Sequence, residues 1–354
     1  MDDVAALREN VGPAERGRSL AGQRILFIAV RDFGYAQQIT DELRRRGAEV
    51  DYLLDRPFDT PIMSAATRYM RPAIMPFADR YYFRKLAELG NKEYTQVFVL
   101  NGVTVSTRLL AALRARMPRA RFLFYIWDSM RNRPSAPALL PYFDDKVTFD
   151  PEAAEQYDMR LRPLFFAPGF ETPADGEPEY DLSFIGTAHS DRYHIISTLG
   201  AALGTEVKPY WYLFLKAPWV FYAEKLMNPA FKRARRDDFK YETLGFAKVQ
   251  QVFRKSRAIV DIEHPHQMGL TMRTFEALGS GKKLITTNTH VRDYPFYDSQ
   301  NMHVIDRANP SLPDEFLKTP YRPLPQELYY QYSLAGWVDS LMGSDGAAGT
   351  GNPK

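Results

Sequence analysis

Short apolar runs rich in β-branched and aromatic residues recur along the chain, and stretches that can form helices separate them. The first two runs are Arg24 to Val30 (RILFIAV) and Glu49 to Leu54 (EVDYLL), and the stretch between them contains a predicted helix that stops at Gly47. Strand, helix and strand at this spacing predict a βαβ unit with parallel strands. This feature constrains the fold most, because buried parallel strands need helices on both faces of their sheet.

The alternation continues through the rest of the chain. In the first half, further strands are predicted at Gln96 to Leu100, Arg121 to Ile126, near Lys146 to Phe149 and at Leu164 to Ala167, with a helix over Thr107 to Arg116. In the second half, strands are predicted at Tyr180 to Ile185, Val207 to Leu213, Ala258 to Ile262 and Lys283 to Thr286, with helices over Arg192 to Leu203, Phe246 to Arg257, Thr271 to Gly279 and Gln326 to Leu341. The pattern predicts an α/β fold with two doubly wound, Rossmann-like parallel sheets.

Length and local composition suggest where the domains divide. A chain of 354 residues exceeds the size that one hydrophobic core usually serves. We expect a polar leader over 1–22, a first domain over 23–168, a Pro-, Gly- and acid-rich linker over 169–179, a second domain over 180–324, a terminal helix over 325–342 that crosses back to the first domain, and a disordered tail over 343–354. The two domains should face a cleft at the carboxyl ends of their strands.

Composition excludes several classes of protein. The chain has no cysteine, which rules out disulfides and thiolate metal sites and fits a reducing cytoplasm. A net charge of +3 is too small to predict a nucleic-acid partner. The polar N-terminus does not resemble a signal peptide, and no run approaches the roughly 20 apolar residues that span a bilayer. We therefore expect a cytoplasmic protein that is soluble or peripheral to the membrane.

The stretch HPHQMGLTMRTFEALGSGKKLITTN, which begins at His264, predicts an anion site. A loop follows the strand at Ala258 to Ile262, so Gly269, Leu270 and Thr271 would present free backbone N–H groups at the start of a helix. Arg273 in the first turn would add a charged contact to a diphosphate.

Glu276, one turn later, would suit a ribose, because one carboxylate can accept hydrogen bonds from two hydroxyls. The alternative interpretation is structural. Thr271 would then only cap the helix, Arg273 and Glu276 would be a solvated surface pair, and His264 and His266 would be ordinary loop residues.

These residues resemble a known family. The chain matches the signature R-T-F-E-x-L-x-x-G of the spore-maturation glycosyltransferase-like group, within the GT-B-fold glycosyltransferases that build bacterial surface polysaccharides, at Arg273, Thr274, Phe275, Glu276, Leu278 and Gly281. The resemblance implies that Glu276 binds the donor ribose, that the loop amides from Gly269 to Thr271 hold the diphosphate, and that the acceptor binds the first domain.

One position departs from that resemblance. Many GT-B enzymes, retaining ones especially, carry two glutamates with seven residues between them; Glu276 matches the second, and the position of the first is Met268 in this chain. The role of the missing carboxylate would fall to His264, His266 or Glu263. Whether the reaction retains or inverts the configuration of the sugar stays open.

The loop after the strand at Tyr180 to Ile185 is a second candidate part of the donor site. Gly186 would let phosphates approach, Arg192 would pair with them, and Thr187 is a further candidate contact to the donor. The alternative is a tight turn in which Ser190 or Asp191 caps the next helix.

The first domain supplies candidate groups for the acceptor. Asp32, directly after the first strand, is the preferred general base, and Asp128 is the second choice. Arg31, Asn101 and Trp127 also follow strand ends and are expected to contact the acceptor. The alternatives are a helix cap for Asp32 and a half-buried core aromatic for Trp127.

Two segments, Thr67 to Lys85 and Trp211 to Arg236, combine aromatic and basic residues and break the alternation. This combination suits an anionic membrane surface, although core packing with a solvated charged end would produce it too. The predicted membrane contacts are Trp219, Phe221, Lys232, Arg233, Arg235 and Arg236.

No metal is expected, because the chain has neither an Asp-x-Asp pair for a diphosphate-bound cation nor histidines at zinc spacing. The sequence therefore predicts a metal-independent glycosyltransferase without a bound cofactor, peripheral on the inner face of the cell membrane. It would move a sugar from a nucleoside-diphosphate donor to a cell-surface glycan, such as a lipopolysaccharide or exopolysaccharide, or to a lipid-linked acceptor. The alternatives are a catalytically silent binding or assembly module at the membrane and a nucleotide-sugar epimerase.

Overall fold

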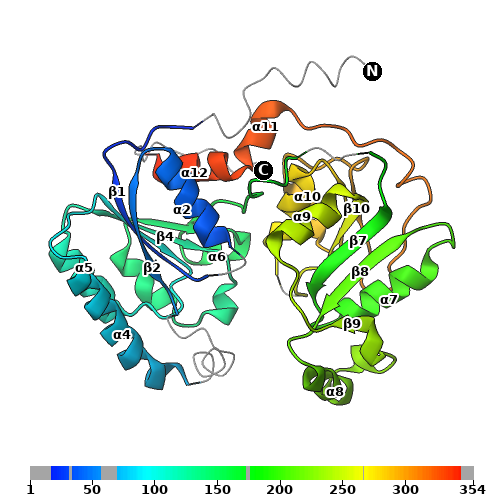
Figure 1. Ribbon diagram of the computed structural model, residues 1–354, viewed down its shortest axis with the longest axis horizontal. Helices are drawn as coiled ribbons and strands as arrows, with labels where there is room; N and C mark the ends of the chain where they lie inside the picture. Colours follow the sequence, from blue (N-terminus) through cyan, green and yellow to red (C-terminus); the bar gives the residue numbers. More distant parts are fainter. Residues whose placement is uncertain (1–16, 32–33, 57–69, 173–175, 266, 344–354) are drawn as a thin grey trace. The chain divides into compact units, whose positions relative to one another are not determined.

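The chain divides into two compact α/β units (Figure 1). The computed structural model describes residues 17–31, 34–56, 70–172, 176–265 and 267–343. The first unit comprises residues 1–162 and 333–354, and the second comprises residues 163–332. The division thus falls before residue 163, and residues 163–168, which we expected to end the first domain, belong to the second unit.

The first unit contains a six-stranded sheet in which all paired strands are parallel, with strand order β2-β1-β3-β4-β5-β6. The strands are β1 (Arg24–Ala29), β2 (Glu49–Leu54), β3 (Gln96–Leu100), β4 (Arg121–Ile126), β5 (Asp145–Thr148) and β6 (Arg160–Leu161). The prediction of a strand at Leu164 to Ala167 is wrong, because β6 is the last strand of this sheet. The backbone N–H of Phe166 instead donates to the carbonyl of Tyr332 at 2.9 Å.

Helices cover both faces of this sheet. They are α2 (Tyr35–Arg45), α4 (Arg71–Glu88), α5 (Thr107–Arg116), α6 (Pro151–Gln156) and α12 (Leu334–Met342), with the 3-10 helices η2 (Met130–Asn132) and η3 (Pro137–Tyr142). One core combines α4 and α5 with alternate strand residues. On the other set of strand positions, Trp337 of α12 packs on Tyr125 and Phe98, with ring centroids 4.9 and 6.3 Å away.

We expected the aromatic and basic segment from Thr67 to Lys85 to break the alternation, and this expectation is wrong for its described part. Its described part forms most of α4, the crossover helix between β2 and β3, and Tyr82 of that helix is fully buried.

The predicted C-terminal helix is two helices. The first, α11 (Gln326–Gln331), lies in the second unit, and α12 lies in the first. The helix is interrupted between them because Ser333 caps a new helix, its hydroxyl accepting a hydrogen bond from the N–H of Gly336 at 3.1 Å. Buried Arg46 fixes α12, since its Nη2 donates to the carbonyl of Ala335 at 2.6 Å and its guanidinium pairs with Asp339.

The second unit contains a six-stranded sheet, also parallel throughout its paired strands, with strand order β12-β11-β10-β7-β8-β9. The strands are β7 (Tyr180–Thr187), β8 (Pro209–Phe214), β9 (Phe239–Lys240), β10 (Ser256–Asp261), β11 (Lys283–Thr286) and β12 (Met302–Val304). The helices are α7 (Arg192–Ala202), α8 (Pro218–Met227), α9 (Phe246–Arg254) and α10 (Met272–Gly279), with η4 (Pro229–Phe231), η5 (Arg236–Asp238) and η6 (Thr289–Asp293). The predicted fold class, two doubly wound parallel sheets with a terminal helix in the first unit, is confirmed.

Candidate functional site

The strand order of the second sheet creates a switch point between β7 and β10. From β7 the chain proceeds to β8 on one side, and from β10 it proceeds to β11 on the other side. Loops that leave neighbouring strands in opposite directions open a crevice at their carboxyl ends, which is where open α/β sheets bind ligands. The two candidate donor loops, after β7 and after β10, are the loops of this switch point.

A buried carboxylate at the end of β10 fixes the start of α10. Asp261 is 3% exposed, and its Oδ2 accepts hydrogen bonds from the hydroxyls of Thr271 at 2.8 Å and Thr274 at 2.7 Å. The Thr271 oxygen also accepts the backbone N–H of Arg273 at 3.1 Å, so Thr271 caps the helix. The first turn of α10 is thereby held against the strand end, with its N-terminus at the switch point. Our sequence analysis missed Asp261, which lies inside an apolar strand.

Arg273 and Glu276 form an ion pair in which the glutamate is buried and the arginine is partly exposed. Nη1 of Arg273 lies 2.8 Å from Oε2 of Glu276, and Nη2 donates to the carbonyl of Ile185 in β7 at 2.9 Å. Glu276 is 2% exposed. The solvated surface pair considered above is therefore wrong for these residues. In this conformation Arg273 pairs with the carboxylate that we expected to bind a ribose.

Arg192 joins the ends of the two switch-point strands. Its Nε donates to the carbonyl of Ile262 at 2.7 Å and its Nη1 to the carbonyl of Thr187 at 3.0 Å. Burial lowers the pKa of this guanidinium to about 10. Within the described part of the chain, no carboxylate forms a salt bridge with Arg192. A cation in this setting is suited to an anionic ligand.

Gly186 leaves room for the ring of Phe184, next to this arginine. A Cβ atom at Gly186 would lie 2.9 Å from the ring of Phe184 and 3.4 Å from Nη1 of Arg192. Only the distance to Phe184 is shorter than an ordinary van der Waals contact, so the packing of that ring favours glycine here, besides any approach of a phosphate.

Arg307, which sequence reasoning did not identify, ties the two loops together. Its Nη1 lies 2.8 Å from Asp191 at the start of α7, and its Nη2 donates to the carbonyl of Glu263 at 2.8 Å and pairs with the Glu263 carboxylate. Glu263 also accepts the hydroxyl of Thr287 at 2.5 Å. Burial raises the pKa of Glu263, and the bonds from Thr287 and Arg307 oppose that rise. Asp191 and Glu263 thus fix the loops through one arginine.

The switch point also holds histidines. The rings of His189 and His264 lie 6.1 Å apart, one from each loop, and Nδ1 of His189 is 3.0 Å from the hydroxyl of Ser190. Burial, with the nearby charges of Arg192 and His264, lowers the pKa of His189 to about 4. His189 is thus neutral at physiological pH. His266 lies outside the described residues.

The loop before α10 is held from both sides. Gly269 and Leu270 are buried. Nε2 of Gln267 donates to the carbonyl of Gly269 at 2.8 Å, and Nδ2 of Asn288, after β11, donates to the carbonyl of Met268 at 3.2 Å. These bonds hold the segment that leads into the N-terminus of α10.

The candidate residues of the first unit follow β1, β3 and β4, also at carboxyl ends. Asn101 adopts a left-handed conformation with φ of 67°, is 2% exposed, and accepts the N–H of Trp127 at 3.1 Å. Trp127 is half-buried, with its ring edge-on to Tyr35 at 6.2 Å. Arg31 is exposed, and Asp32, the preferred base, lies outside the described residues.

The carboxylate of Asp128, the second candidate base, accepts hydrogen bonds from three residues that follow it closely in the chain. Its Oδ1 accepts the N–H of Ser129 at 2.9 Å and Nδ2 of Asn132 at 3.1 Å, and its Oδ2 accepts Nε of Arg133 at 3.0 Å. Three donors on one carboxylate indicate a structural role at the start of η2.

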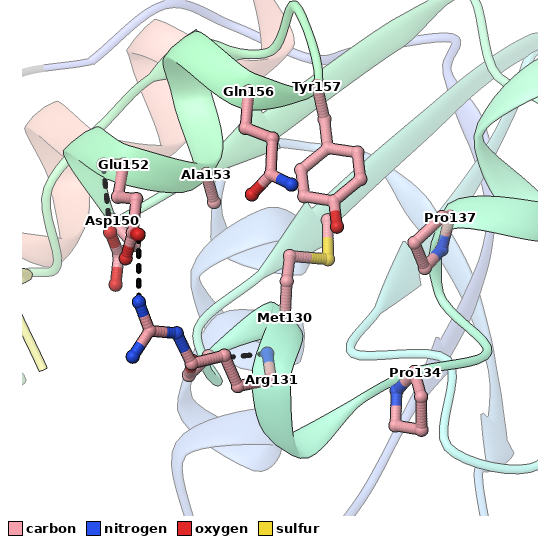
Figure 2. Close-up of a pocket in the computed structure, with 10 residues that line it drawn as sticks. Met130, Arg131, Pro134, Pro137, Asp150, Glu152, Ala153, Gln156 and Tyr157 are labelled. Carbon is pink, nitrogen blue, oxygen red and sulfur yellow. Dashed lines mark hydrogen bonds and ion pairs between the residues drawn. The ribbon is translucent and has the colours of Figure 1, made fainter. Parts of the chain in front are cut away.

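An open pocket of about 470 Å³ lies between the segments that follow β4 and β5 (Figure 2). Arg131 and Glu152, which form an ion pair at 2.8 Å and are both substantially exposed, line it together with Met130 and Tyr157. The sequence did not predict this pocket, because its lining comes from two separate loops.

The predicted membrane contacts divide into two groups. Trp219 is 71% exposed, and the four basic residues of the prediction, Lys232, Arg233, Arg235 and Arg236, are exposed. Phe221 is 4% exposed and packs on Phe239 in the core, so the expectation of a surface contact is wrong for this residue. In the described part of the chain, no helix is both long enough and apolar enough to span a membrane.

Comparisons with known proteins give a fold-level likeness. No family model matches the chain, and no curated protein matches it. Among solved structures, a glycosyltransferase from Rickettsia africae covers 92% of this chain and all of its own at 10% identity, with a TM-score of 0.45. The Anabaena protein Alr3699/HepE, solved with UDP and glucose, covers 91% of this chain and 90% of its own at 10% identity, with a TM-score of 0.47. At these identities and scores the likenesses identify neither a family nor an activity for this chain.

Proposed function

We propose that the chain is a glycosyltransferase that binds a nucleoside-diphosphate sugar at the switch point of the second sheet. The observation that carries the proposal is the convergence there of the N-terminus of α10, the guanidinium of Arg192, and Glu276 on α10. A helix N-terminus beside a cation suits a diphosphate, and a carboxylate one turn further along suits the hydroxyls of a ribose. The resemblance of residues 273–281 to a donor-site signature supports the same assignment.

Donor binding requires Arg273 to exchange partners. Arg273 now forms an ion pair with Glu276. A diphosphate at the start of α10 would draw Arg273 away from Glu276 and leave the carboxylate for the ribose. The resting ion pair therefore keeps Glu276 neutralised until a donor arrives.

The proposed acceptor is a cell-surface glycan or its lipid-linked precursor, bound at the carboxyl edge of the first sheet. The pocket beside β4 and β5 offers Arg131 and Glu152 to sugar hydroxyls, with Tyr157 as an apolar surface. An acceptor hydroxyl would attack the anomeric carbon of the donor sugar, forming a new C–O bond as the bond to the diphosphate breaks. In an inverting reaction the proton of the hydroxyl would pass to a carboxylate, for which Asp32 is the candidate.

The leaving diphosphate takes the electron pair of the broken bond. We propose that the α10 amides and Arg192 stabilise its charge without a divalent ion.

Nucleotide binding tests the donor site directly. Nucleoside diphosphates of each base are added to the wild type and to Glu276→Gln, and the melting temperature is measured. A ligand that binds only the folded state at about 100 times its Kd stabilises that state by about 2.7 kcal/mol. We expect one nucleotide to stabilise the wild type and to lose most of its effect in Glu276→Gln.

Glu42→Gln is the matched control, because Glu42 is a buried carboxylate of the first unit that pairs with Arg45 and Arg46. Its response to the nucleotide should equal that of the wild type. If no nucleotide stabilises the wild type, or if both variants respond alike, the donor site is rejected.

A binding or assembly module without catalysis is the second candidate, and the engagement of Asp128 by three donors favours it. Release of the nucleoside diphosphate from a sugar donor, in the presence of a bacterial glycolipid extract, separates the two functions. A module binds the donor and releases nothing, whereas an epimerase converts the donor sugar without the extract.

A further inference from the structure

Helix α8 presents a large apolar surface to solvent. Trp219 is 71% exposed, Tyr222 59%, Leu226 88% and Met227 73%. Because these residues are separated by three, four and one positions, they lie on one side of the helix. Side chains of this size and exposure, gathered on one short helix, mark an interaction site.

The opposite side of α8 already anchors the helix to the second unit. Phe221 is buried, with its ring 5.6 Å from that of Phe239, and Phe231 of η4 stacks on Phe239 at 5.4 Å. Lys225 donates from Nζ to the carbonyl of Ala234 at 2.7 Å, which ties the helix to the segment that follows. The exposed residues are therefore not needed to hold α8 in place.

Strong positive charge accompanies this apolar side. Residues 216–240 contain seven basic and three acidic residues, a net charge of +4, whereas the whole chain carries only +3. Lys232, Arg233, Arg235 and Arg236, which follow α8, are all exposed. In the part of the chain that the structure describes, Arg235 is the member of this cluster that forms a salt bridge, at 3.4 Å to Asp238.

The apolar side of α8 belongs to the same edge of the sheet as the candidate donor site. The helix follows β8 after three residues, so it begins at the carboxyl edge. Directly after α8, Nδ2 of Asn228 donates to the carbonyl of Ser190, in the loop after β7, at 3.0 Å. Figure 1 shows α8 at the margin of the second unit, next to β9.

We propose that α8 and the basic segment 232–236 form a docking surface for a lipid bilayer that contains anionic lipids. Trp219, Tyr222, Leu226 and Met227 enter the boundary between headgroups and acyl chains, and the basic residues contact the headgroups. Trp and Tyr favour this boundary because their rings have an apolar body and a polar tip.

The charge favours a membrane over a second copy of this chain. A two-fold dimer through α8 would bring the two basic segments together, because each partner contributes the same patch. This repulsion is absent on an anionic bilayer, where each Lys or Arg near the surface adds roughly 1 kcal/mol of attraction. This docking surface is separate from the donor site and does not depend on the proposed function.

Co-sedimentation with vesicles tests the proposal. The full chain is mixed with vesicles of phosphatidylcholine alone and of phosphatidylcholine with phosphatidylglycerol. We expect binding to the mixed vesicles only. Trp219→Ser/Leu226→Ser and, separately, Lys232→Gln/Arg233→Gln should each weaken it on the order of tenfold. Phe77→Ser is the matched control, because Phe77 is 63% exposed on α4 of the first unit, and it should bind like the wild type.

Tryptophan emission gives a second readout. Trp219 is 71% exposed whereas Trp337 is fully buried. The emission of the wild type should shift to the blue on mixed vesicles, and Trp219→Phe should lose most of the shift while it still sediments.

Failure to bind either vesicle would overturn the proposal, as would binding that the α8 variants leave unchanged. A chain that dimerises in sedimentation velocity, ignores vesicles and becomes monomeric in Trp219→Ser/Leu226→Ser would show that the partner is a second copy, which also overturns it. Nucleotide stabilisation of the same variants should equal that of the wild type, so failure of the docking surface is distinguishable from failure of the donor site.

Discussion

Arg273 and Glu276 form an ion pair in the first turns of α10, with Nη1 and Oε2 2.8 Å apart, the glutamate side chain 3% exposed and the arginine side chain 23% exposed. Nη2 of Arg273 donates a hydrogen bond to the carbonyl of Ile185, so the pair also joins α10 to β7. A ligand that takes Arg273 from Glu276 therefore acts on the same contacts that hold the helix to the sheet.

Removal of one member of this pair should destabilise the second unit far more than removal of both. Arg273→Met removes the positive charge that pairs with the buried Glu276 carboxylate and should cost about 3 kcal/mol, because the charge of a buried pair that is broken is no longer compensated. Arg273→Met/Glu276→Gln should recover much of that loss. Urea unfolding of the single and double variants measures the coupling energy between Arg273 and Glu276. If the losses in free energy of unfolding were additive, the two residues would not be coupled and the prediction would be contradicted.

Local signals sufficed for much of the fold. Strands β2, β3, β4 and β11 and helix α5 have the predicted boundaries, because apolar runs, a Ser cap at Ser106 and helix-stop residues act within a few positions of one another. The switch-point loops were predicted for the same reason.

Contacts between distant segments could not be predicted. Arg307 is 44 residues from Glu263 and 116 from Asp191, and nothing in its own neighbourhood marks it as the residue that joins the two loops. Likewise, Phe221 and Trp219 are near neighbours in a segment of similar aromatic residues, yet one is 4% and the other 71% exposed. Which side of α8 faces the sheet depends on packing with Phe231 and Phe239, which follow it in the chain.

Stability should fall in mild acid because of His189. Its pKa drops from 6.5 to about 4 in the folded chain, so between these values the unfolded chain binds more protons. Neutral His189 makes its full contribution to the free energy of unfolding above pH 6.5. As the pH falls toward 4, that free energy decreases by about 1 to 3 kcal/mol. Urea unfolding at pH 7 and at pH 4.5 should show a smaller decrease for His189→Asn than for the wild type.

His194→Asn is the control for that experiment, because His194 is an exposed histidine on α7 of the same unit. It should retain the wild-type decrease. Equal pH dependence of the wild type and His189→Asn would show that other groups cause the loss.

The two candidate bases should respond differently to the same change. The Asp128 carboxylate accepts hydrogen bonds from Ser129, Asn132 and Arg133, and Asp128→Asn retains one oxygen that can accept them. Because this role is structural, the variant should lower the transfer rate by less than about tenfold. Asp32→Asn should lower the rate by about 100-fold or more if it removes the base. Initial rates of sugar transfer measure both, and a large loss in Asp128→Asn alone would assign the base to Asp128.

The charge on the leaving diphosphate should be carried by Arg192. Arg192→Gln retains a donor for the carbonyl of Ile262 or of Thr187 but removes the positive charge, and we expect kcat/KM for the donor to fall about 10- to 100-fold, the range for one charged hydrogen bond. Arg257→Gln, which alters an exposed arginine of β10 that pairs with Asp181 at 3.4 Å, should leave kcat/KM for the donor unchanged.

Since Arg192 and the α10 amides then suffice to stabilise the charge of the diphosphate, EDTA should not slow the wild type. Inactivation by EDTA with recovery on added Mg²⁺ would instead assign that charge to a divalent ion, and Arg192 would be left with the role of joining β7 to β10.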